Sequence, residues 1–219
     1  MKRLMLLGAS GSIGTQTIDV VLQHPDAFAL VGISVGHRID ILKEILAKIS
    51  VSHVCVCEEK DMKELAHQYP DTHFYFGDEG LLTLSKMSEY DLLVNALVGF
   101  VGFLPTLNAI QTGHNIALAN KETLVVGGEL IEKAIKEYGV SLYPIDSEHS
   151  AIFQALQGNE HKEMKRLLIT ASGGSFRNRT REELKDVSVE QALAHPNWAM
   201  GAKITIDSAD MMNKGFEVI

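Results

Sequence analysis

Cysteine is scarce in this chain of 219 residues, which contains only Cys55 and Cys57. They alternate along an expected strand, so their side chains point to opposite faces, and we interpret both as reduced structural thiols, which suits a reducing cytoplasm. No apolar run approaches the roughly 20 residues that a membrane-spanning helix needs. The first expected strand begins at Arg3 or Leu4, which leaves no room for a signal or transit peptide. We therefore expect a cytoplasmic protein with no membrane partner.

An excess of positive charge is also missing. The chain has 20 Lys and Arg against 28 Asp and Glu, a formal net charge of −8. No basic stripe is present, so nucleic acid is not expected as a partner. A phosphorylated small molecule remains compatible, because it needs only a local positive pocket. The hydrophobic content of 46% suffices for one large domain, or for one domain and part of another.

The sequence does contain short apolar runs that alternate with helical periodicity, a pattern typical of βα units and a parallel sheet. Strands are expected at residues 4–8, 29–35, 51–57, 74–76, 91–96, 115–119 and 141–145. The pattern changes near residue 147, and further strands are expected at 164–170 and 203–207. Between these two lies a long polar stretch, and long loops in compact domains are often lids or binding loops. The fold class is therefore α/β, with a domain boundary near residue 146.

Three glycines, Gly8, Gly11 and Gly14, follow the first expected strand and open a helix. In this context glycines permit a tight turn and a close approach of the backbone to a pyrophosphate, while the helix N-terminus supplies free N–H groups. The segment predicts a dinucleotide site in a Rossmann-like domain. The alternative is a plain turn between a strand and a helix.

The end of the second expected strand bears on the choice of cofactor. NAD-binding folds usually place Asp or Glu there to bind the ribose hydroxyls. Here Gly36, His37 and Arg38 follow the strand, without an acid. Arg38 or His37 could meet a 2′-phosphate, which favours NADP over NAD. The alternative is that Arg38 is a solvated residue at the start of a helix.

Carboxylates occur in two distant segments that could converge. Asp146 and Glu148 follow the last strand of the first domain, and Glu217 lies near residue 219. Mg²⁺ and Mn²⁺ favour oxygen ligands, so these three residues are candidate metal ligands. Taken alone, the first pair is unspecific, and capping of the helix that starts near Ser147 explains it equally well.

A phosphate site is expected from two other segments. Ser172-Gly173-Gly174 follows an expected strand and offers a hydroxyl and backbone N–H groups, a plausible anion nest. Ser208, Asn213 and Lys214 add hydrogen-bonding side chains and a cation, although Ser208 could simply cap a helix.

The polar loop itself carries His195 and Trp198. A Trp in a polar loop could cover a ligand. His195 could bind substrate, or it could cap a turn.

These segments together resemble the 1-deoxy-D-xylulose 5-phosphate reductoisomerase family, collinearly from Met1 to Ile219. The motifs that carry the resemblance are Gly8-to-Gly14, Ala119-Asn120-Lys121-Glu122, Asp146-Ser147-Glu148-His149, Ser172-Gly173-Gly174, His195-Pro196-Asn197-Trp198 with Met200-Gly201, and Met211-to-Glu217.

The resemblance implies a role for each matching residue. NADPH would be contacted by Ser10, Gly11, Ser12, Ile13, Gly36, His37, Arg38, Asn120, Glu122 and Gly201. Mg²⁺ or Mn²⁺ would be bound by Asp146, Glu148 and Glu217. The sugar phosphate substrate would be contacted by Lys121, Ser147, Ser172, His195, Ser208, Asn213 and Lys214, with Trp198 in a flexible lid at about 172–201.

The resemblance also implies an organisation and an activity. Residues 1–146 would form an NADPH-binding, Rossmann-like domain with a mostly parallel sheet. Residues 147–219 would form the first part of an α/β catalytic domain, whose remainder, like the C-terminal helical domain of the homodimeric relatives, is absent from the chain. The implied reaction converts 1-deoxy-D-xylulose 5-phosphate to 2-C-methyl-D-erythritol 4-phosphate in the non-mevalonate isoprenoid pathway. The alternatives are an NADPH-binding fragment without turnover, and another NADP-dependent oxidoreductase.

Overall fold

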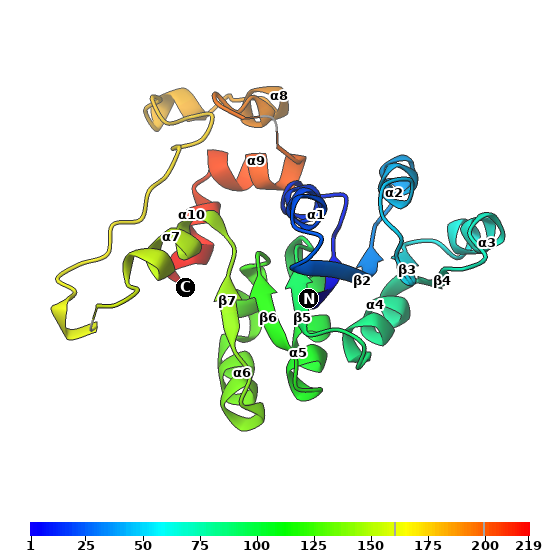
Figure 1. The fold of residues 1–219 in the computed structure, drawn as a ribbon. Helices are drawn as coiled ribbons and strands as arrows, with labels where there is room; N and C mark the ends of the chain where they lie inside the picture. Colours follow the sequence, from blue (N-terminus) through cyan, green and yellow to red (C-terminus); the bar gives the residue numbers. More distant parts are fainter. Residues whose placement is uncertain (160, 199) are drawn as a thin grey trace. The chain divides into compact units, whose positions relative to one another are not determined.

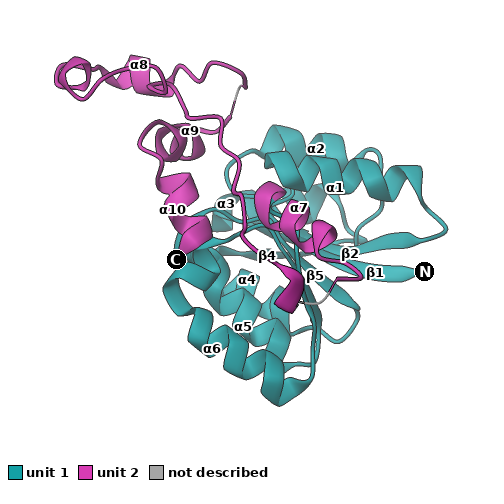
Figure 2. Cartoon of the chain, turned by 90° about the vertical axis from the view of Figure 1, so that its left-hand side faces the viewer, with its two compact units in different colours: residues 1–146 teal, residues 147–219 magenta. Residues whose placement is uncertain are grey.

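The computed structural model describes residues 1–159, 161–198 and 200–219. These residues form two compact units, Met1–Asp146 and Ser147–Ile219 (Figure 2). The division falls directly after Asp146. Within the described residues, no helix is both long enough and apolar enough to cross a membrane.

The first unit is built on a seven-stranded sheet in the order β4-β3-β2-β1-β5-β6-β7, and all its strand pairs are parallel. The strands are β1 Lys2–Leu7, β2 Phe28–Ser34, β3 His53–Val56, β4 His73–Phe76, β5 Leu92–Asn95, β6 Asn115–Leu118 and β7 Leu142–Pro144. Each of the seven strands expected in this unit is confirmed, with small differences at the ends. The α/β class and the mostly parallel sheet are therefore confirmed.

Helices cover both faces of this sheet (Figure 1). They are α1 Ser12–Gln23, α2 Ile39–Leu46, α3 Glu59–Gln68, α4 Gly77–Lys86, α5 Phe103–Gln111 and α6 Glu122–Tyr138, with a 3-10 turn at Gly99–Gly102. Side chains alternate along β1, because successive residues of a strand point to opposite faces. Leu4 and Leu6 pack with buried residues of α1, α2 and α3, whereas Met5 and Leu7 pack with those of α4, α5 and α6.

The strand order creates a switch point at β1, which pairs with β2 on one side and with β5 on the other. In open parallel sheets, ligands bind beyond the carboxyl ends of the strands at such a point, where the connecting segments diverge. The Gly8–Gly14 turn follows β1 and therefore lies at this position.

The second unit consists of short helices joined by extended segments. They are α7 Ser147–Ala155, α8 Val189–Leu193, α9 Ala202–Ala209 and α10 Met212–Val218, with 3-10 turns at His161–Glu163 and Glu182–Leu184. The expected lid at about 172–201 thus contains a 3-10 turn and α8; its residue 199 lies outside the described residues.

Both strands expected in the second unit are wrong. Residues 203–207 lie inside α9, whose buried residues Thr205 and Ser208 have helical spacing. Alternation over five residues does not separate a strand from a helix turn. Residues 164–170 are exposed and belong to no strand. Apolar sequence alone does not make a strand, because a strand also needs a neighbour for its backbone hydrogen bonds.

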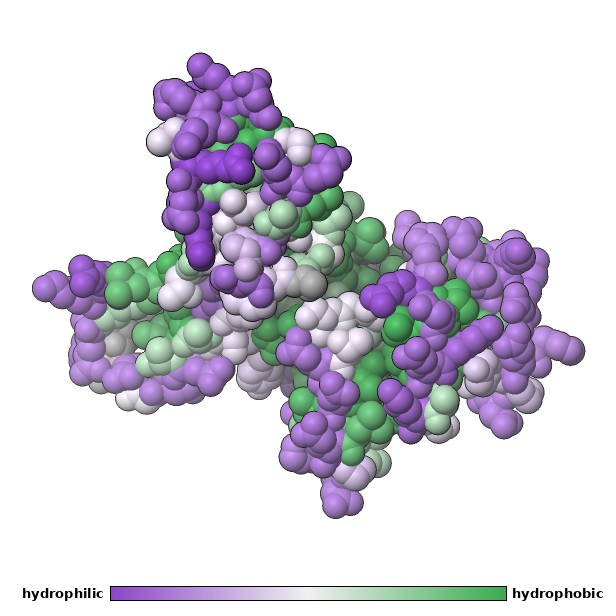
Figure 3. All heavy atoms as spheres, turned by 90° about the horizontal axis from the view of Figure 1, so that it is seen from above, coloured by the Kyte–Doolittle hydropathy of each residue, from purple (hydrophilic) through white to green (hydrophobic). Residues whose placement is uncertain are grey.

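Apolar side chains remain exposed along this extended segment, with Leu168 73% and Leu167 50% exposed. The segment lines a cavity of about 660 Å³, together with Glu148, Ile152 and other residues of α7. Figure 3 shows hydrophobic residues exposed between hydrophilic ones on one face of the molecule. The cavity lies within the second unit, and its lining mixes apolar side chains with the charged residues Glu148, Glu163, Lys165 and Arg166.

Candidate nucleotide and metal sites

The glycines of the first βα turn are required by close backbone contacts. Gly8 has φ of 88°, and a side chain there would run into the main chain of Ala96. A side chain at Gly14 would run into the carbonyl of Gly8. These contacts hold the turn against the end of β5 and bring α1 close behind it, which leaves the N-terminus of α1 open at the switch point of the sheet.

That N-terminus has backbone donors to offer. Gly11 precedes α1 and provides no side-chain cap. Among the described residues, the N–H groups of Ser12 and Ile13 have no backbone acceptor. Since the first N–H groups of a helix lack partners within it and carry partial positive charge, they suit an anion such as a pyrophosphate. The predicted role of this turn is consistent with its geometry.

Arg38 projects toward the same turn. Its guanidinium Nη1 donates to the main-chain oxygen of Ser10 at 3.1 Å. Arg38 also precedes α2 and is exposed, as are Gly36 and His37. Arg38 is thus both a solvated residue at the start of a helix and a cation beside the nucleotide turn, so the two interpretations are compatible. Ser34 supports the turn by accepting the N–H of Gly8 with its hydroxyl, at 3.0 Å.

Asn120 is buried and its side chain is already engaged. Its amide donates to the main-chain oxygens of Leu97 and Gly99, both at 2.9 Å, and its Oδ1 accepts from the N–H and hydroxyl of Thr123. Asn120 therefore orders the segment after β5. Glu122 begins α6 directly beside it. A nucleotide contact by either residue stays a prediction.

Sequence reasoning missed Asn95, the last residue of β5. It is fully buried, and its amide donates to the main-chain oxygen of Gly102 at 3.0 Å and to the hydroxyl of Thr106 at 2.8 Å. Together with Asn120 it fixes the loop at the carboxyl ends of β5 and β6. A polar Asn that ends an otherwise apolar strand was the available signal.

Lys121 and Asp146 form an ion pair within the first unit. Lys121 Nζ lies 3.0 Å from Asp146 Oδ1, and the two side chains are only 9% and 13% exposed. Lys121 directly follows Asn120 at the start of α6, and Asp146 follows β7. The parallel pairing of β6 with β7 brings these two positions together. Lys121 thus fixes a carboxylate that was predicted as a metal ligand.

In the second unit, Glu148 and Glu217 converge on one cation. Lys214 Nζ donates to both carboxylate oxygens of Glu217, at 2.9 and 2.8 Å, and also to Glu148 Oε1. Oxygen atoms of the two carboxylates lie within 4.8 Å of one another. His149 Nε2 lies 3.3 Å from the main-chain oxygen of Glu217 and links α7 to α10 again. The predicted convergence of these two carboxylates is consistent with this arrangement.

Ser172 and His195 also meet, although 23 residues separate them. Ser172 Oγ lies 3.0 Å from His195 Nε2. His195 Nδ1 accepts the N–H groups of Asn197 and Trp198, at 3.2 and 3.1 Å. Because Nδ1 is an acceptor, a neutral His195 carries its proton on Nε2 and donates it to Ser172. His195 also stacks on Trp198, with ring centroids 5.1 Å apart.

A close backbone approach joins Gly174, two residues after Ser172, to Ser208. Gly174 donates its N–H to Ser172 Oγ at 3.2 Å and has φ of 66°. A side chain at Gly174 would run into the carbonyl of Ser208, which is itself buried. The two segments predicted to share a phosphate therefore lie in contact within the second unit.

The other predicted residues of this unit are placed as follows. Ser147 begins α7, Gly201 is exposed directly before α9, and Asn213 is partly buried in α10. Trp198 is 58% exposed.

The two cysteines differ in their surroundings. Cys55 is buried in β3, and burial raises the pKa of its thiol to about 12, so it is the structural thiol that was expected. Cys57 lies past the end of β3 and is exposed. The pKa of its thiol is raised by partial desolvation and by nearby acids, Glu58 foremost. Both cysteines are free thiols, and a structural role for Cys57 stays a prediction.

The sequence and structure were also compared with known proteins. A family model described as 1-deoxy-D-xylulose 5-phosphate reductoisomerase matches residues 4–128, and one described as the C-terminal domain of that enzyme matches residues 142–219. Reductoisomerases of this name from Geobacillus sp. (strain WCH70) and Geobacillus kaustophilus (strain HTA426) are 54% and 56% identical over 220 residues. Each alignment covers 100% of this chain and 58% of the relative.

Solved structures of reductoisomerases are also similar to this chain. A crystal structure of DOX-P reductoisomerase in complex with NADPH, fosmidomycin and magnesium has a TM-score of 0.90 at 38% identity, covering 100% of this chain and 57% of that one. The Zymomonas mobilis enzyme in complex with NADPH has a TM-score of 0.86 at 34% identity, covering 99% and 56%. The chain thus spans 58% of the length of the curated relatives it matches. It belongs to the 1-deoxy-D-xylulose 5-phosphate reductoisomerase family.

Proposed function

We propose that this chain contributes to an NADPH- and divalent-metal-dependent reductoisomerase that converts 1-deoxy-D-xylulose 5-phosphate to 2-C-methyl-D-erythritol 4-phosphate. Residues 1–146 bind NADPH, and residues 147–219 form the first part of the catalytic domain. The observation that carries the proposal is the convergence of Glu148 and Glu217 on one cation, Lys214 Nζ. A metal-independent NADP-dependent oxidoreductase has no need for such a cluster.

The nucleotide half of the proposal rests on the turn after β1. The pyrophosphate is bound by backbone N–H groups of the Gly8–Gly14 turn and the first residues of α1. Arg38, already bonded to the main chain of Ser10, meets the 2′-phosphate. The remaining proposed contacts are made by Ser10, Gly11, Ser12, Ile13, Gly36, His37, Asn120, Glu122 and Gly201.

The metal half rests on the donor chemistry of three carboxylates. Asp146, Glu148 and Glu217 offer only oxygen, which Mg²⁺ and Mn²⁺ prefer. Asp146 is two residues from Glu148 in the sequence. Asp146 is paired with the ammonium group of Lys121, and Glu148 and Glu217 are both paired with the ammonium group of Lys214. An ammonium group that lies among carboxylates is a stand-in for a metal cation. When bound, the metal supplies a Lewis acid for substrate oxygens.

The substrate is a sugar phosphate, and the protein groups that bind it are neutral donors and a lysine. Gly174 donates to the Ser172 hydroxyl and packs against the main chain of Ser208, and Asn213 and Lys214 follow in α10. Glu148 and Glu217 would hold the metal in place of the Lys214 ammonium, which would then be available to the phosphate. His195 donates a hydrogen bond and Trp198 covers the substrate, while Lys121 and Ser147 contact its oxygens near the metal.

NADPH oxidation tests this function. The 219-residue chain is mixed with NADPH, 1-deoxy-D-xylulose 5-phosphate and Mn²⁺, with and without chelator. We expect oxidation that requires both the substrate and the metal. The Glu148→Gln variant should lose metal-dependent turnover while it retains NADPH binding. Glu182→Gln, which removes an exposed carboxylate of the same unit, is the matched control and should behave as the unaltered chain.

A second candidate is nucleotide binding without turnover. It is favoured by one observation, that the chain spans 58% of the length of its curated relatives. NADPH binding and Mn²⁺ binding without oxidation would support this candidate against the first. Oxidation that survives chelation and Glu148→Gln would instead support a metal-independent NADP oxidoreductase.

A further inference from the structure

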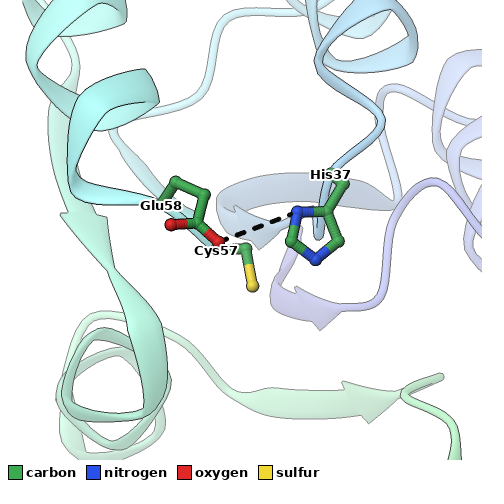
Figure 4. Close-up of side chains that lie close together, drawn as sticks. All are labelled: His37, Cys57 and Glu58. Atoms are coloured by element: carbon green, nitrogen blue, oxygen red, sulfur yellow. Dashed lines mark ion pairs between the residues drawn. The ribbon is translucent and has the colours of Figure 1, made fainter.

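A second cluster of metal-binding residue types lies in the first unit, at the carboxyl ends of β2 and β3. These strands are parallel, and Ser34 pairs with Cys55. The N–H of Val35 donates to the Cys55 oxygen at 2.9 Å, beyond the end of β2. The segments that follow the two strands therefore leave the sheet side by side. His37 comes from the first segment, and Cys57 and Glu58 come from the second (Figure 4).

The potential ligand atoms of these three side chains are already close. One nitrogen of His37, the sulfur of Cys57 and one oxygen of Glu58 all lie within 4.8 Å of one another. His37 Nδ1 is 4.0 Å from Glu58 Oε1. Tetrahedral zinc with N, O and S ligands at about 2.0 to 2.3 Å separates them by roughly 3.5 Å. Small rotations close that gap, and the side chains of His37 and Glu58 are 73% and 61% exposed, which leaves room for them.

The donor set selects the kind of ion. Imidazole, thiolate and carboxylate together favour Zn²⁺ and related transition metals, whereas Mg²⁺ and Ca²⁺ favour oxygen alone. The carboxylates of Asp61 and Asp78 lie near enough to act electrostatically on the Cys57 thiol, and this negative charge attracts a cation. We propose that His37, Cys57 and Glu58 form a zinc-class metal site with three protein ligands and an open fourth position.

Binding of a metal ion at this site releases one proton. The Cys57 thiol gives up its S–H proton to solvent and forms a sulfur–metal bond, because a thiolate rather than a thiol is the ligand. His37 binds through a neutral ring nitrogen, and Glu58 through an ionised oxygen. No oxidation or reduction is involved.

The position of His37 gives the site a consequence for the nucleotide, which rests on the proposed function. His37 lies between Gly36 and Arg38, and Arg38 is the proposed partner of the 2′-phosphate. A metal ion bound to His37 draws residues 36–38 toward the end of β3 and fixes the side chain of His37. Zinc therefore competes with NADPH, and Cys57 makes nucleotide binding sensitive to a metal that the catalytic carboxylates do not require.

Titration with Co²⁺ tests the site directly, because cobalt bound to a thiolate absorbs in the near ultraviolet. Excess Mg²⁺ is added so that the oxygen-only carboxylates are occupied. We expect one equivalent of Co²⁺ to produce the absorption in the unaltered chain and in Glu59→Gln. Glu59 is the adjacent exposed acid, paired with Lys63 instead. Zn²⁺ should displace the cobalt and abolish the absorption.

Variants assign the ligands. Cys57→Ser should eliminate the absorption. His37→Ala and Glu58→Gln should each weaken Co²⁺ binding at least about tenfold, the lower end of what is lost when a group that only supports a metal ligand is removed. The three side chains are exposed, so folding is expected to persist, and circular dichroism checks this. The proposal is overturned by absence of absorption in the unaltered chain, by its persistence in Cys57→Ser, or by unchanged affinity in both other variants.

NADPH binding, followed by nucleotide fluorescence, tests the competition separately. Zn²⁺ should raise the apparent Kd for NADPH in the unaltered chain and leave it unchanged in Cys57→Ser. An NADPH affinity that Zn²⁺ does not alter overturns the competition, although the metal site stands if the cobalt result is positive. A chain that binds no NADPH at all removes the proposed function, and the cobalt absorption still decides the metal site.

Discussion

Lys214 and Glu217, three residues apart in α10, form a two-point contact in which one ammonium nitrogen lies 2.9 and 2.8 Å from the two carboxylate oxygens. The same nitrogen reaches Glu148 in α7. The side chain of Glu217 has no exposed surface in this arrangement. A buried carboxylate destabilises the fold unless it is paired. Glu217 therefore needs a cation beside it, which is the Lys214 ammonium when no metal is bound.

Lys214→Met should therefore make the second unit depend on metal. In chelator we expect a loss of about 1.5–3 kcal/mol in the free energy of unfolding, the typical worth of a hydrogen bond to a charged group. Mn²⁺ should restore more stability to this variant than it adds to the unaltered chain, since no ammonium competes with it. Denaturant unfolding with and without Mn²⁺ measures both quantities.

Lys203→Met is the control for this experiment, because Lys203 pairs with Asp207 in the neighbouring helix α9. It should show no added response to Mn²⁺. Equal stabilisation of the Lys214 and Lys203 variants by Mn²⁺ would refute the view that Lys214 occupies the place of a metal.

Arg38 should determine the preference for NADPH over NADH. Its guanidinium is positioned by the main chain of Ser10, beside the nucleotide turn. Arg38→Asp should weaken NADPH binding roughly ten- to hundredfold, the equivalent of one charge-assisted contact, and should change NADH binding little. Arg38→Lys keeps the charge and should lose less. Calorimetric titration of each variant with both nucleotides is the measurement, and equal losses for NADPH and NADH would argue against a 2′-phosphate contact.

Gly174 should be far less tolerant of a side chain than another left-handed glycine of the same unit. Gly174→Ala places a methyl group against the carbonyl of Ser208, whereas Gly158, with φ of 77°, has open space beside it. Both variants incur about 1–2 kcal/mol for the left-handed conformation. Gly174→Ala should lose at least about 1 kcal/mol more, because its backbone must also move. Denaturant unfolding compares them; equal losses would mean that this contact is unimportant.

His114 should make the first unit less stable in mild acid. Burial lowers the pKa of its ring from the usual 6.5, and the ring stacks on Tyr90 with centroids 4.0 Å apart. Below pH 6.5 the unfolded chain binds a proton at this residue more readily than the folded chain does, so stability falls as the pH decreases toward the lowered pKa. Below that pKa both states are protonated and the loss is complete.

The slope from this one group cannot exceed about 1.4 kcal/mol per pH unit. His114→Phe keeps a ring against Tyr90 and removes the titration. The difference in unfolding free energy between pH 7.5 and pH 5.5 should therefore be smaller in His114→Phe than in the unaltered chain. An identical pH dependence would show that His114 does not contribute.

The sheet could be predicted from the sequence because its signals are local. Each strand is an apolar run bounded by turn residues, and the Gly8–Gly14 segment has to lie at the carboxyl end of β1. The wrong strands lie where the local signal is ambiguous. Residues 203–207 alternate as a strand does but form part of α9, and residues 164–170 have strand-like composition without a neighbouring strand.

The partners of the site residues could not be predicted in the same way. That Lys214 bonds Glu148, or that His195 Nε2 points to Ser172, depends on contacts between residues more than 20 positions apart. Cys57 has the sequence context of a strand thiol, and its exposed position beside His37, 20 residues earlier, could not be predicted either. Such contacts are set by how helices and loops pack, and no short-range pattern records them.

Turnover is the sharpest test of the proposal that this chain binds NADPH and a divalent metal for one reaction. NADPH oxidation is followed with 1-deoxy-D-xylulose 5-phosphate and Mn²⁺, in the unaltered chain and in Glu148→Gln. We expect oxidation that requires Mn²⁺, stops on chelation and is lost in the variant. Binding of both NADPH and Mn²⁺ without any oxidation, or oxidation that is unchanged by chelator and by Glu148→Gln, would contradict it.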